Sequence, residues 1–330
     1  MPTFILGAGF NLDATSEAGP IFGESLHDQI DCGYPLVGDA LRLCFELDRA
    51  PDGKSVEDLF ANASERGDYG PLRRLAGCLR KADFYIARSI ASDKKLNCYR
   101  RFFRTFAGSN FLTFNYDSLP ETLLFQLERW FPHDGYGLPV ATRVLPWSKG
   151  FDGKKSSSLV LHLHGSLCIR TSEYEARRER GEGVAWLTKR DEPLYSFDPR
   201  SIPANFRGFD AHVGTDDIES RIIAPIPDKS RDLEEPFIRG TYENAEAMVR
   251  ASDKVVAIGY SFNHYDRASY QRLLHALGKS TGRRLVVVSP DAGTIANSIR
   301  PCFPDLSIEA VDATFREWTA ASFPGLVQRR

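Results

Sequence analysis

Several short apolar runs in this chain end abruptly in glycine or small polar residues, and this feature constrains the fold most. Three of these runs are residues 3–6, 110–114 and 254–258. Continuous apolar runs of this length, without polar alternation, are typical of strands buried on both faces of a parallel sheet. Stretches with apolar residues at three- and four-residue spacing separate the runs and predict helices. The pattern therefore predicts an α/β protein with a doubly wound, mainly parallel Rossmann-like sheet and a helical subdomain.

The length allows either two domains or one large α/β domain, since 330 residues is about twice the usual domain of roughly 150. We predict one domain over 1–330. The helical stretches before the second strand are too many for a single crossover, so residues 33–105 are expected to form a helical insertion. Residues 170–215 are polar and lack periodicity, which predicts a surface excursion or lid.

Composition excludes several classes of protein. The 42 Lys and Arg residues against 44 Asp and Glu give a net charge of −2, so no direct nucleic-acid binding is expected. No apolar run is long enough to cross a membrane, and the start of the chain has no basic leader, so we expect a cytoplasmic protein without membrane contact. The 6 cysteines include no CxxC pair and are expected to be reduced thiols.

A histidine pair is the one metal-like pattern in the chain. On a strand, His162 and His164 would point to the same face and could hold a metal ion. No carboxylate or cysteine near them in the sequence completes a site, so no metal is expected. His162 lies deeper in the strand and is predicted to be a core histidine with a satisfied hydrogen bond.

Unusual residues follow each predicted strand. In parallel sheets the ligand binds beyond the carboxyl ends of the strands, so these residues are expected to converge on one crevice. The candidates are Gly7, Ala8, Gly9, Asn115, Asp117, His164, Gly259, Ser261 and Asp291.

The first turn suggests an anion site. Gly7 and Gly9 would let backbone N–H groups and a helix N-terminus approach a pyrophosphate. Position 12 is Leu, so the full GxGxxG pattern is absent, and a purely structural glycine turn is an open alternative. Asn11 could cap the helix or bond a phosphate or ribose.

The next two strand ends suggest reacting groups. Asn115 could orient a water molecule or a sugar hydroxyl, whereas Asp117 is explained equally well as a helix cap. His164, between an apolar strand and a glycine, is a candidate general base, although a lone histidine is more often structural.

The last third of the chain supplies candidate ribose contacts. Gly259 and Ser261 form a small-residue turn, and Asp291 follows the next strand, where a carboxylate commonly accepts from ribose hydroxyls. His264 and Asp266 open a helix, and capping is the leading explanation of both.

Taken in order, these motifs resemble the sirtuin superfamily, and specifically its sirtuin-like NAD hydrolases of bacterial anti-phage defence. The likeness runs from residue 3 to about residue 291, but the four-cysteine zinc module of deacylating sirtuins is absent. The motifs that carry the likeness are Gly7-Ala8-Gly9-Phe10-Asn11, Tyr34-Pro35-Leu36, Thr113-Phe114-Asn115-Tyr116-Asp117, His162-Leu163-His164-Gly165-Ser166, Pro225, Pro227, Lys229 and Gly259-Tyr260-Ser261-Phe262 with Asp266.

The resemblance implies an NAD+ glycohydrolase that cleaves NAD+, its substrate, to nicotinamide and ADP-ribose. Asn115 would position a water or the nicotinamide ribose, His164 would be the catalytic base, and Asp117 would support them. The cofactor contacts that it implies are Gly7, Ala8, Gly9, Phe10 and Asn11 on the pyrophosphate side, and Gly259, Ser261 and Asp291 on the adenosine side.

The resemblance also implies a biological setting. The protein would be a homo-oligomeric defence effector that depletes NAD+ when self-assembly or a partner activates it. A hexameric DNA-translocating ATPase and a short Argonaute are the partners expected by analogy. Two alternatives remain open: a zinc-free NAD-dependent protein deacylase or ADP-ribosyltransferase, and a non-catalytic subunit that senses ADP-ribose or NAD.

Overall fold

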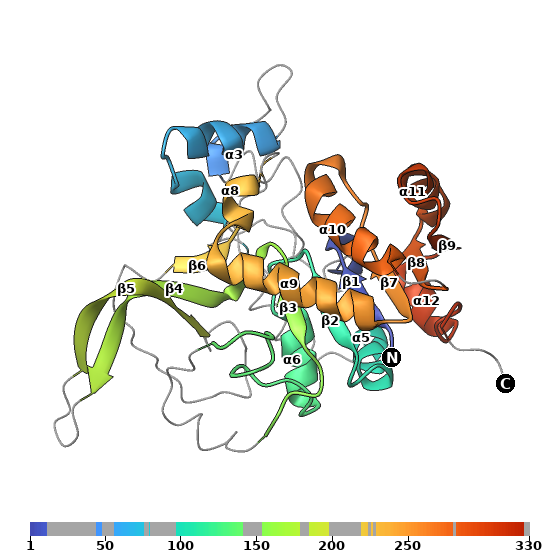
Figure 1. The fold of residues 1–330 in the computed structure, drawn as a ribbon, viewed down its shortest axis with the longest axis horizontal. Coiled ribbons are helices and arrows are strands. Elements are labelled where there is room, and N and C mark those ends of the chain that lie inside the picture. The colour runs from blue at the N-terminus through green and yellow to red at the C-terminus, as the bar shows by residue number, and fades with distance from the viewer. Residues whose placement is uncertain are drawn as a thin grey trace, which may run out of the picture.

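A wholly parallel sheet of six strands forms the centre of the molecule (Figure 1). The computed structural model describes residues 1–11, 44–47, 56–75, 79, 97–140, 154–178, 185–197, 219–223, 226, 229–279 and 282–326. In spatial order the strands are β3 (Val160–His162), β2 (Asn110–Thr113), β1 (Thr3–Leu6), β7 (Lys254–Ile258), β8 (Arg284–Ser289) and β9 (Ser307–Asp312). The predicted doubly wound parallel sheet is confirmed.

The strands form where the apolar runs predict them. Every residue of β1 is buried, and β7 and β8 are buried after their first residue. Such burial on both faces is what parallel strands between two helix layers require, and Val, Ile and Leu satisfy it without polar alternation. The strand 254–258 agrees with its prediction at both ends.

The order of the strands defines a switch point at the middle of the sheet. From β1 the chain proceeds to β2 and β3 on one side, and from β7 to β8 and β9 on the other. β1 and β7 are neighbours, with Leu6 opposite Ile258. Ligands of open α/β sheets bind outside the carboxyl ends of the strands at such a point.

Helices cover the sheet in two groups. Helix α9 (Pro236–Ala251) contacts α10 (Arg267–Gly278) and β3, whereas α5 (Asn97–Thr105) contacts α6 (Leu119–Gln126) and α12 (Phe315–Ala320). Smaller elements complete the described chain. They are α3 (Val56–Glu65), α8 (Ser230–Leu233), η4 (His264–Asp266), α11 (Ala292–Ile299) and η5 (Arg300–Cys302).

Helix α9 illustrates why one boundary moved from its predicted place. The apolar pattern predicts a helix from residue 234, but the helix begins at Pro236. Glu235 adopts extended backbone, and its side chain accepts a hydrogen bond from the Ile238 N–H. A carboxylate cap followed by proline at the first helical position is a strong start signal.

Part of the predicted excursion 170–215 belongs to an antiparallel sheet. Strands β4 (Gly165–Arg178) and β5 (Ala185–Phe197) pair with each other, and β4 also pairs with β6 (Glu219–Ile222). The sequence analysis did not predict these strands, and the surface excursion itself stays a prediction. The polar residues of this segment form no apolar run that would predict strands. The pairing of β4 with β5 does not need such a run, because backbone hydrogen bonds hold the two strands together. Residues 198–215 lie outside the described residues, and a lid function remains a prediction.

Two hydrophobic clusters hold these parts together. In the main cluster, Phe102 of α5 packs edge-on against Phe4 of β1 at 4.9 Å between ring centroids. In the smaller cluster, Phe60 of α3 lies with Tyr116 and Ile222. This second cluster joins part of the predicted insertion 33–105 to β6 and to the end of β2. Most of that insertion lies outside the described residues.

None of the helices in the described ranges has the length and apolar character that a membrane-spanning segment needs.

Candidate functional site

The polar motifs lie together at the carboxyl edge of the sheet. β2 and β3 are paired with Thr113 opposite His162, so Asn115 and His164 each stand two residues beyond a matched pair. Gly7 follows β1 and Gly259 follows β7, the two strands of the switch point. These four residues therefore stand at one edge of the sheet, and the convergence of all the motifs on one crevice stays a prediction.

Glycines bring β1 and β7 into close contact at this edge. A Cβ on Gly7 would lie 2.5 Å from the Gly259 oxygen, and a Cβ on Gly259 would lie 2.2 Å from the Phe10 nitrogen. The Gly7 N–H donates to Ile258 O and the Gly9 N–H donates to Gly259 O. Both N–H groups thus already donate to backbone carbonyls of the protein. Their predicted contact with a pyrophosphate remains a prediction.

Asn11 and Asp117 form a buried pair across the first two strand ends. Asn11 Nδ2 donates to Asp117 Oδ2 over 2.7 Å, and Asp117 Oδ1 accepts from the Leu119 N–H over 3.0 Å. Asp117 therefore caps the start of α6 and also holds Asn11. The buried Asn11 Oδ1 has no hydrogen-bond partner. A buried acceptor without a partner costs stability and is a common sign of a ligand contact.

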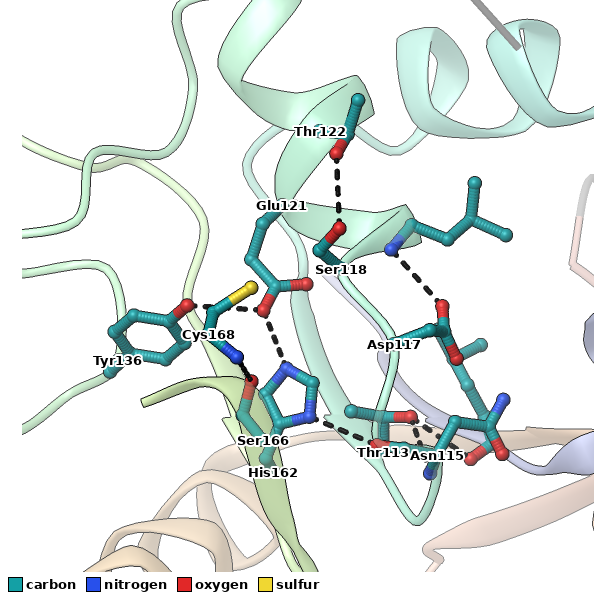
Figure 2. Close-up of polar contacts among 12 residues, drawn as sticks. Thr113, Asn115, Asp117, Ser118, Glu121, Thr122, Tyr136, His162, Ser166 and Cys168 are labelled. Atoms are coloured by element: carbon teal, nitrogen blue, oxygen red, sulfur yellow. Dashed lines mark hydrogen bonds and ion pairs between the residues drawn. The ribbon is translucent and has the colours of Figure 1, made fainter. Parts of the chain in front are cut away.

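The Asn115 amide is fixed from one side only. Asn115 Nδ2 donates to Gly7 O over 3.0 Å. The Asn115 N–H donates to Thr113 Oγ1 over 3.0 Å, a contact that Figure 2 shows. Among the described residues, no donor reaches the Asn115 side-chain oxygen. The amide is buried, so this fixed orientation leaves one acceptor available to a water molecule or a hydroxyl.

His164 is a buried imidazole whose Nε2 has no hydrogen-bond partner among the described residues. Its residue is 6% exposed, and its Nε2 has no hydrogen-bond partner although Asp266 Oδ1 lies 3.4 Å away. That distance allows attraction between charges but not a well-aligned hydrogen bond. The Phe114 ring meets the imidazole edge-on at 5.0 Å, and Tyr260 stacks on Phe114 at 4.2 Å. The ring is thus held by packing, which leaves its nitrogen available.

Lys229 and Asp266 form a buried ion pair beside His164. Lys229 Nζ lies 2.6 Å from Asp266 Oδ1 and also donates to Tyr265 O over 3.3 Å. Asp266 was expected to cap a helix, and this was wrong. Its side chain makes no cap hydrogen bond, and Asn263 caps η4 instead. The local sequence suggests only a cap at Asp266. Its charged partners, Lys229 and His164, come from segments far away in the chain, so the local sequence does not show them.

The surroundings of His164 favour its neutral form. Burial lowers the pKa of His164 to about 4, Asp266 opposes this shift, and Lys229 adds to it. An imidazole that is neutral at pH 7 can accept a proton, as a general base must.

Titration of His164 tests this environment directly. We expect its NMR signal to stay that of a neutral ring from pH 8 down to about pH 5, well below the ordinary value near 6.5. Lys229→Met should raise the pKa of His164, because it removes a cation and leaves the Asp266 carboxylate. A wild-type signal that titrates near pH 6.5 would contradict the burial assigned to this ring.

A second histidine lies in a fully buried polar network. His162 Nε2 is 2.6 Å from Glu121 Oε1, and the Tyr136 hydroxyl donates to the same oxygen over 3.2 Å (Figure 2). His162 was expected to be a satisfied core histidine, and both of its ring nitrogens have partners. Glu121 and Tyr136 were not predicted. A single carboxylate on an apolar helix gives no local sign that it is buried. The only signal that could have found Glu121 is its position one helical turn after the Asp117 motif.

The remaining predicted contacts lie apart from this cluster. Ser261 and Asp291 are exposed, and Asp291 Oδ1 accepts from Ser289 Oγ over 2.5 Å. Within the described ranges, no hydrogen bond or ion pair joins either residue to Asn115 or His164. The expected contacts of Ser261, Asp291 and Gly259 with an adenosine therefore remain predictions, as do those of Ala8 and Phe10.

The part of the chain that the structure describes contains no cluster of metal-ligating side chains. No group of three or more His, Cys, Asp and Glu side chains there could hold a metal ion. His162 uses both ring nitrogens on Glu121 and the Asn115 carbonyl. A paired metal site with His164 would require His162 to give up one of these contacts.

The fold and the site together define a Rossmann-like α/β protein with a buried amide and imidazole at the carboxyl edge of its sheet. No protein-family model and no curated protein sequence matches the chain. Solved structures with a similar course of the chain include Sir2 proteins.

One similar structure is a Sir2 homologue in complex with NAD, at 13% identity and a TM-score of 0.40, covering 97% of this chain and 86% of that chain. A second is a mutant Sir2 homologue with ADP-ribose, at 14% identity and a TM-score of 0.39, covering 97% of this chain and 88% of that one. A third is Sir2Tm bound to a propionylated peptide, at 11% identity and a TM-score of 0.37, covering 97% and 91%. TM-scores below 0.5 assign neither a family nor an activity to this chain.

Proposed function

We propose that this protein is a sirtuin-like NAD+ glycohydrolase. The observation that carries the proposal is a pair of buried groups at neighbouring strand ends. The His164 imidazole has an unpartnered Nε2, and the Asn115 amide is fixed through its nitrogen to Gly7 O. The motifs that resemble sirtuin-like NAD hydrolases supply the substrate class, because both groups belong to those motifs.

The reaction breaks the bond between the nicotinamide nitrogen and C1′ of the ribose. The electron pair of that bond moves to the pyridinium ring, which leaves as neutral nicotinamide, and the sugar gains oxocarbenium character. Water then forms the new bond to C1′, and its proton passes to His164 and on to solvent. The products are ADP-ribose, nicotinamide and one proton, so atoms and charge balance.

The residues fit the demands of this transition state. A cationic sugar needs a water-poor site with fixed dipoles more than it needs a strong nucleophile. The Asn115 side-chain oxygen can accept a hydrogen bond from the attacking water, and neutral His164 can take up its proton. Burial keeps that imidazole a weak base, which suffices when bond breaking precedes proton transfer.

Purified chain incubated with NAD+ tests the proposal, with nicotinamide and ADP-ribose followed over time. Asn115→Ala should lower the rate by about 100-fold or more, because it removes a preorganised dipole. The matched control is Asn62→Ala on α3, whose amide donates to the Asp58 carbonyl, and it should leave the rate unchanged. Equal rates for wild type and folded Asn115→Ala would defeat the assignment of Asn115.

The products separate the alternatives. Deacetylation of an acetylated peptide in step with nicotinamide release would establish the deacylase alternative, and ADP-ribose on protein would establish the transferase. Stabilisation by ADP-ribose without nicotinamide release would indicate a sensing subunit. We further propose that the chain acts as a homo-oligomeric defence effector activated by assembly or by a partner. Adding a candidate ATPase or Argonaute to the same assay tests that part.

A further inference from the structure

The buried pair of His162 and Glu121 lies directly behind the proposed reacting amide. His162 Nδ1 is 2.9 Å from the Asn115 carbonyl oxygen, and His162 Nε2 is 2.6 Å from Glu121 Oε1. Glu121 is 0% exposed and His162 is 2% exposed. Both partners of the ring are acceptors, since one is a backbone carbonyl and the other a carboxylate oxygen.

A neutral imidazole satisfies both contacts only if Glu121 carries a proton on Oε1 and donates it to Nε2, because the ring itself has a single N–H. An imidazolium donates from both nitrogens and neutralises the Glu121 carboxylate in a place where a lone charge would be costly. Glu121 Oε1 also accepts from the Tyr136 hydroxyl, whereas the buried Oε2 has no partner. A proton on Oε2 would have no acceptor, so only these two states satisfy both contacts of the ring.

We propose that His162 is a positioning residue, held as an imidazolium by Glu121, whose Nδ1–H fixes the Asn115 backbone and so aims the Asn115 amide. This inference rests on the proposed function only where it concerns turnover. Asn115 is thus held at two points. Its backbone carbonyl is fixed by His162, and its side-chain amide is fixed by Gly7 O.

The groups around the ring agree with this charge. Burial opposes protonation of His162, but the Glu121 carboxylate and its hydrogen bond raise the pKa of His162 above its ordinary value. The Asn115 carbonyl and the more distant Asp117 act in the same direction. Among the described residues, Tyr136 and Cys168 also lie beside Glu121. Burial raises the pKa of the Tyr136 hydroxyl, so it remains a neutral donor.

The charge state is measured without any turnover. In protein labelled with nitrogen-15 at histidine, we expect one ring at pH 8 to carry protons on both nitrogens, and this signal should be absent from His162→Gln. Glu121→Gln should convert it to a neutral ring, because a glutamine amide can donate to Nε2. A neutral His162 in wild-type protein at pH 8 would overturn the inference, whatever the protein does to NAD+.

The turnover test uses the same variants. His162→Gln should lower kcat by up to about 100-fold with KM nearly unchanged, as expected for a misplaced reacting group. Glu121→Gln should keep most of kcat near pH 7, because its neutral ring still presents Nδ1–H to the Asn115 carbonyl. Tyr136→Phe is the matched control, since it removes a donor from the same carboxylate oxygen and leaves the ring contacts in place.

The pH profile separates positioning from a merely structural role. Above the raised pKa of His162, the remaining proton should stay on Nε2 beside the carboxylate, which sets the bare Nδ1 against the Asn115 carbonyl. Wild-type kcat should therefore fall at alkaline pH, and Glu121→Gln should lack that fall. Identical alkaline limbs, or full kcat in folded His162→Gln, would contradict the proposal. If His162→Gln fails to fold, the double variant Glu121→Gln/His162→Gln replaces it, because it buries no unpaired charge.

Discussion

His164→Ala is expected to lower kcat for NAD+ cleavage by about 100- to 10,000-fold, the usual contribution of a general base. Among the described residues the Nε2 of this imidazole has no hydrogen-bond partner, so its removal leaves no partner there unsatisfied. The variant should therefore stay folded, with a loss of stability limited to the small cavity it creates. Nicotinamide release and a thermal unfolding curve on the same sample measure both quantities.

The matched control for this prediction is His275→Ala. His275 is an exposed histidine on α10, so its loss should change neither turnover nor unfolding. Full turnover by folded His164→Ala would remove the histidine from the mechanism. A variant that loses both its fold and its turnover would instead show that the ring is needed for packing against Phe114.

Gly259→Ala is expected to destabilise the protein by about 3 kcal/mol or more. Gly259 has φ +58, and a Cβ there would lie 2.2 Å from the Phe10 nitrogen and 2.3 Å from the Gly9 carbonyl carbon. A left-handed alanine costs about 1–2 kcal/mol. Overpacking adds about 1–3 kcal/mol, and here the obstructing atoms are backbone and cannot rotate away. Denaturant unfolding of purified protein measures the sum.

Gly282→Ala separates the two costs. Gly282 has φ +78, but nothing lies within 4 Å of a Cβ built there. It should therefore lose only the conformational part, about 1–2 kcal/mol. If both variants lost equal stability, the close approach of β1 and β7 would not be what requires glycine at Gly259.

The acid-base behaviour of the two neighbouring histidines illustrates the limits of local sequence. His162 and His164 are separated by one residue, yet burial lowers the pKa of His164 while Glu121 raises the pKa of His162. The sequence correctly distinguished His162 as the deeper residue. It could not supply the charges, because Glu121 comes from α6 and Asp266 from η4, which follows β7 and lies about 100 residues further along the chain.

The sequence by itself determined the parallel sheet and the edge at which its polar motifs meet. Continuous apolar runs and the glycines that end them are local features, and parallel pairing then brings their carboxyl ends to one edge. The β4–β5 ribbon, the Lys229–Asp266 pair and the Glu121–His162 pair were decided only by the tertiary structure. Each depends on which distant backbone or charge becomes the neighbour once water is excluded, and that choice is made by packing of the whole chain rather than by any short segment.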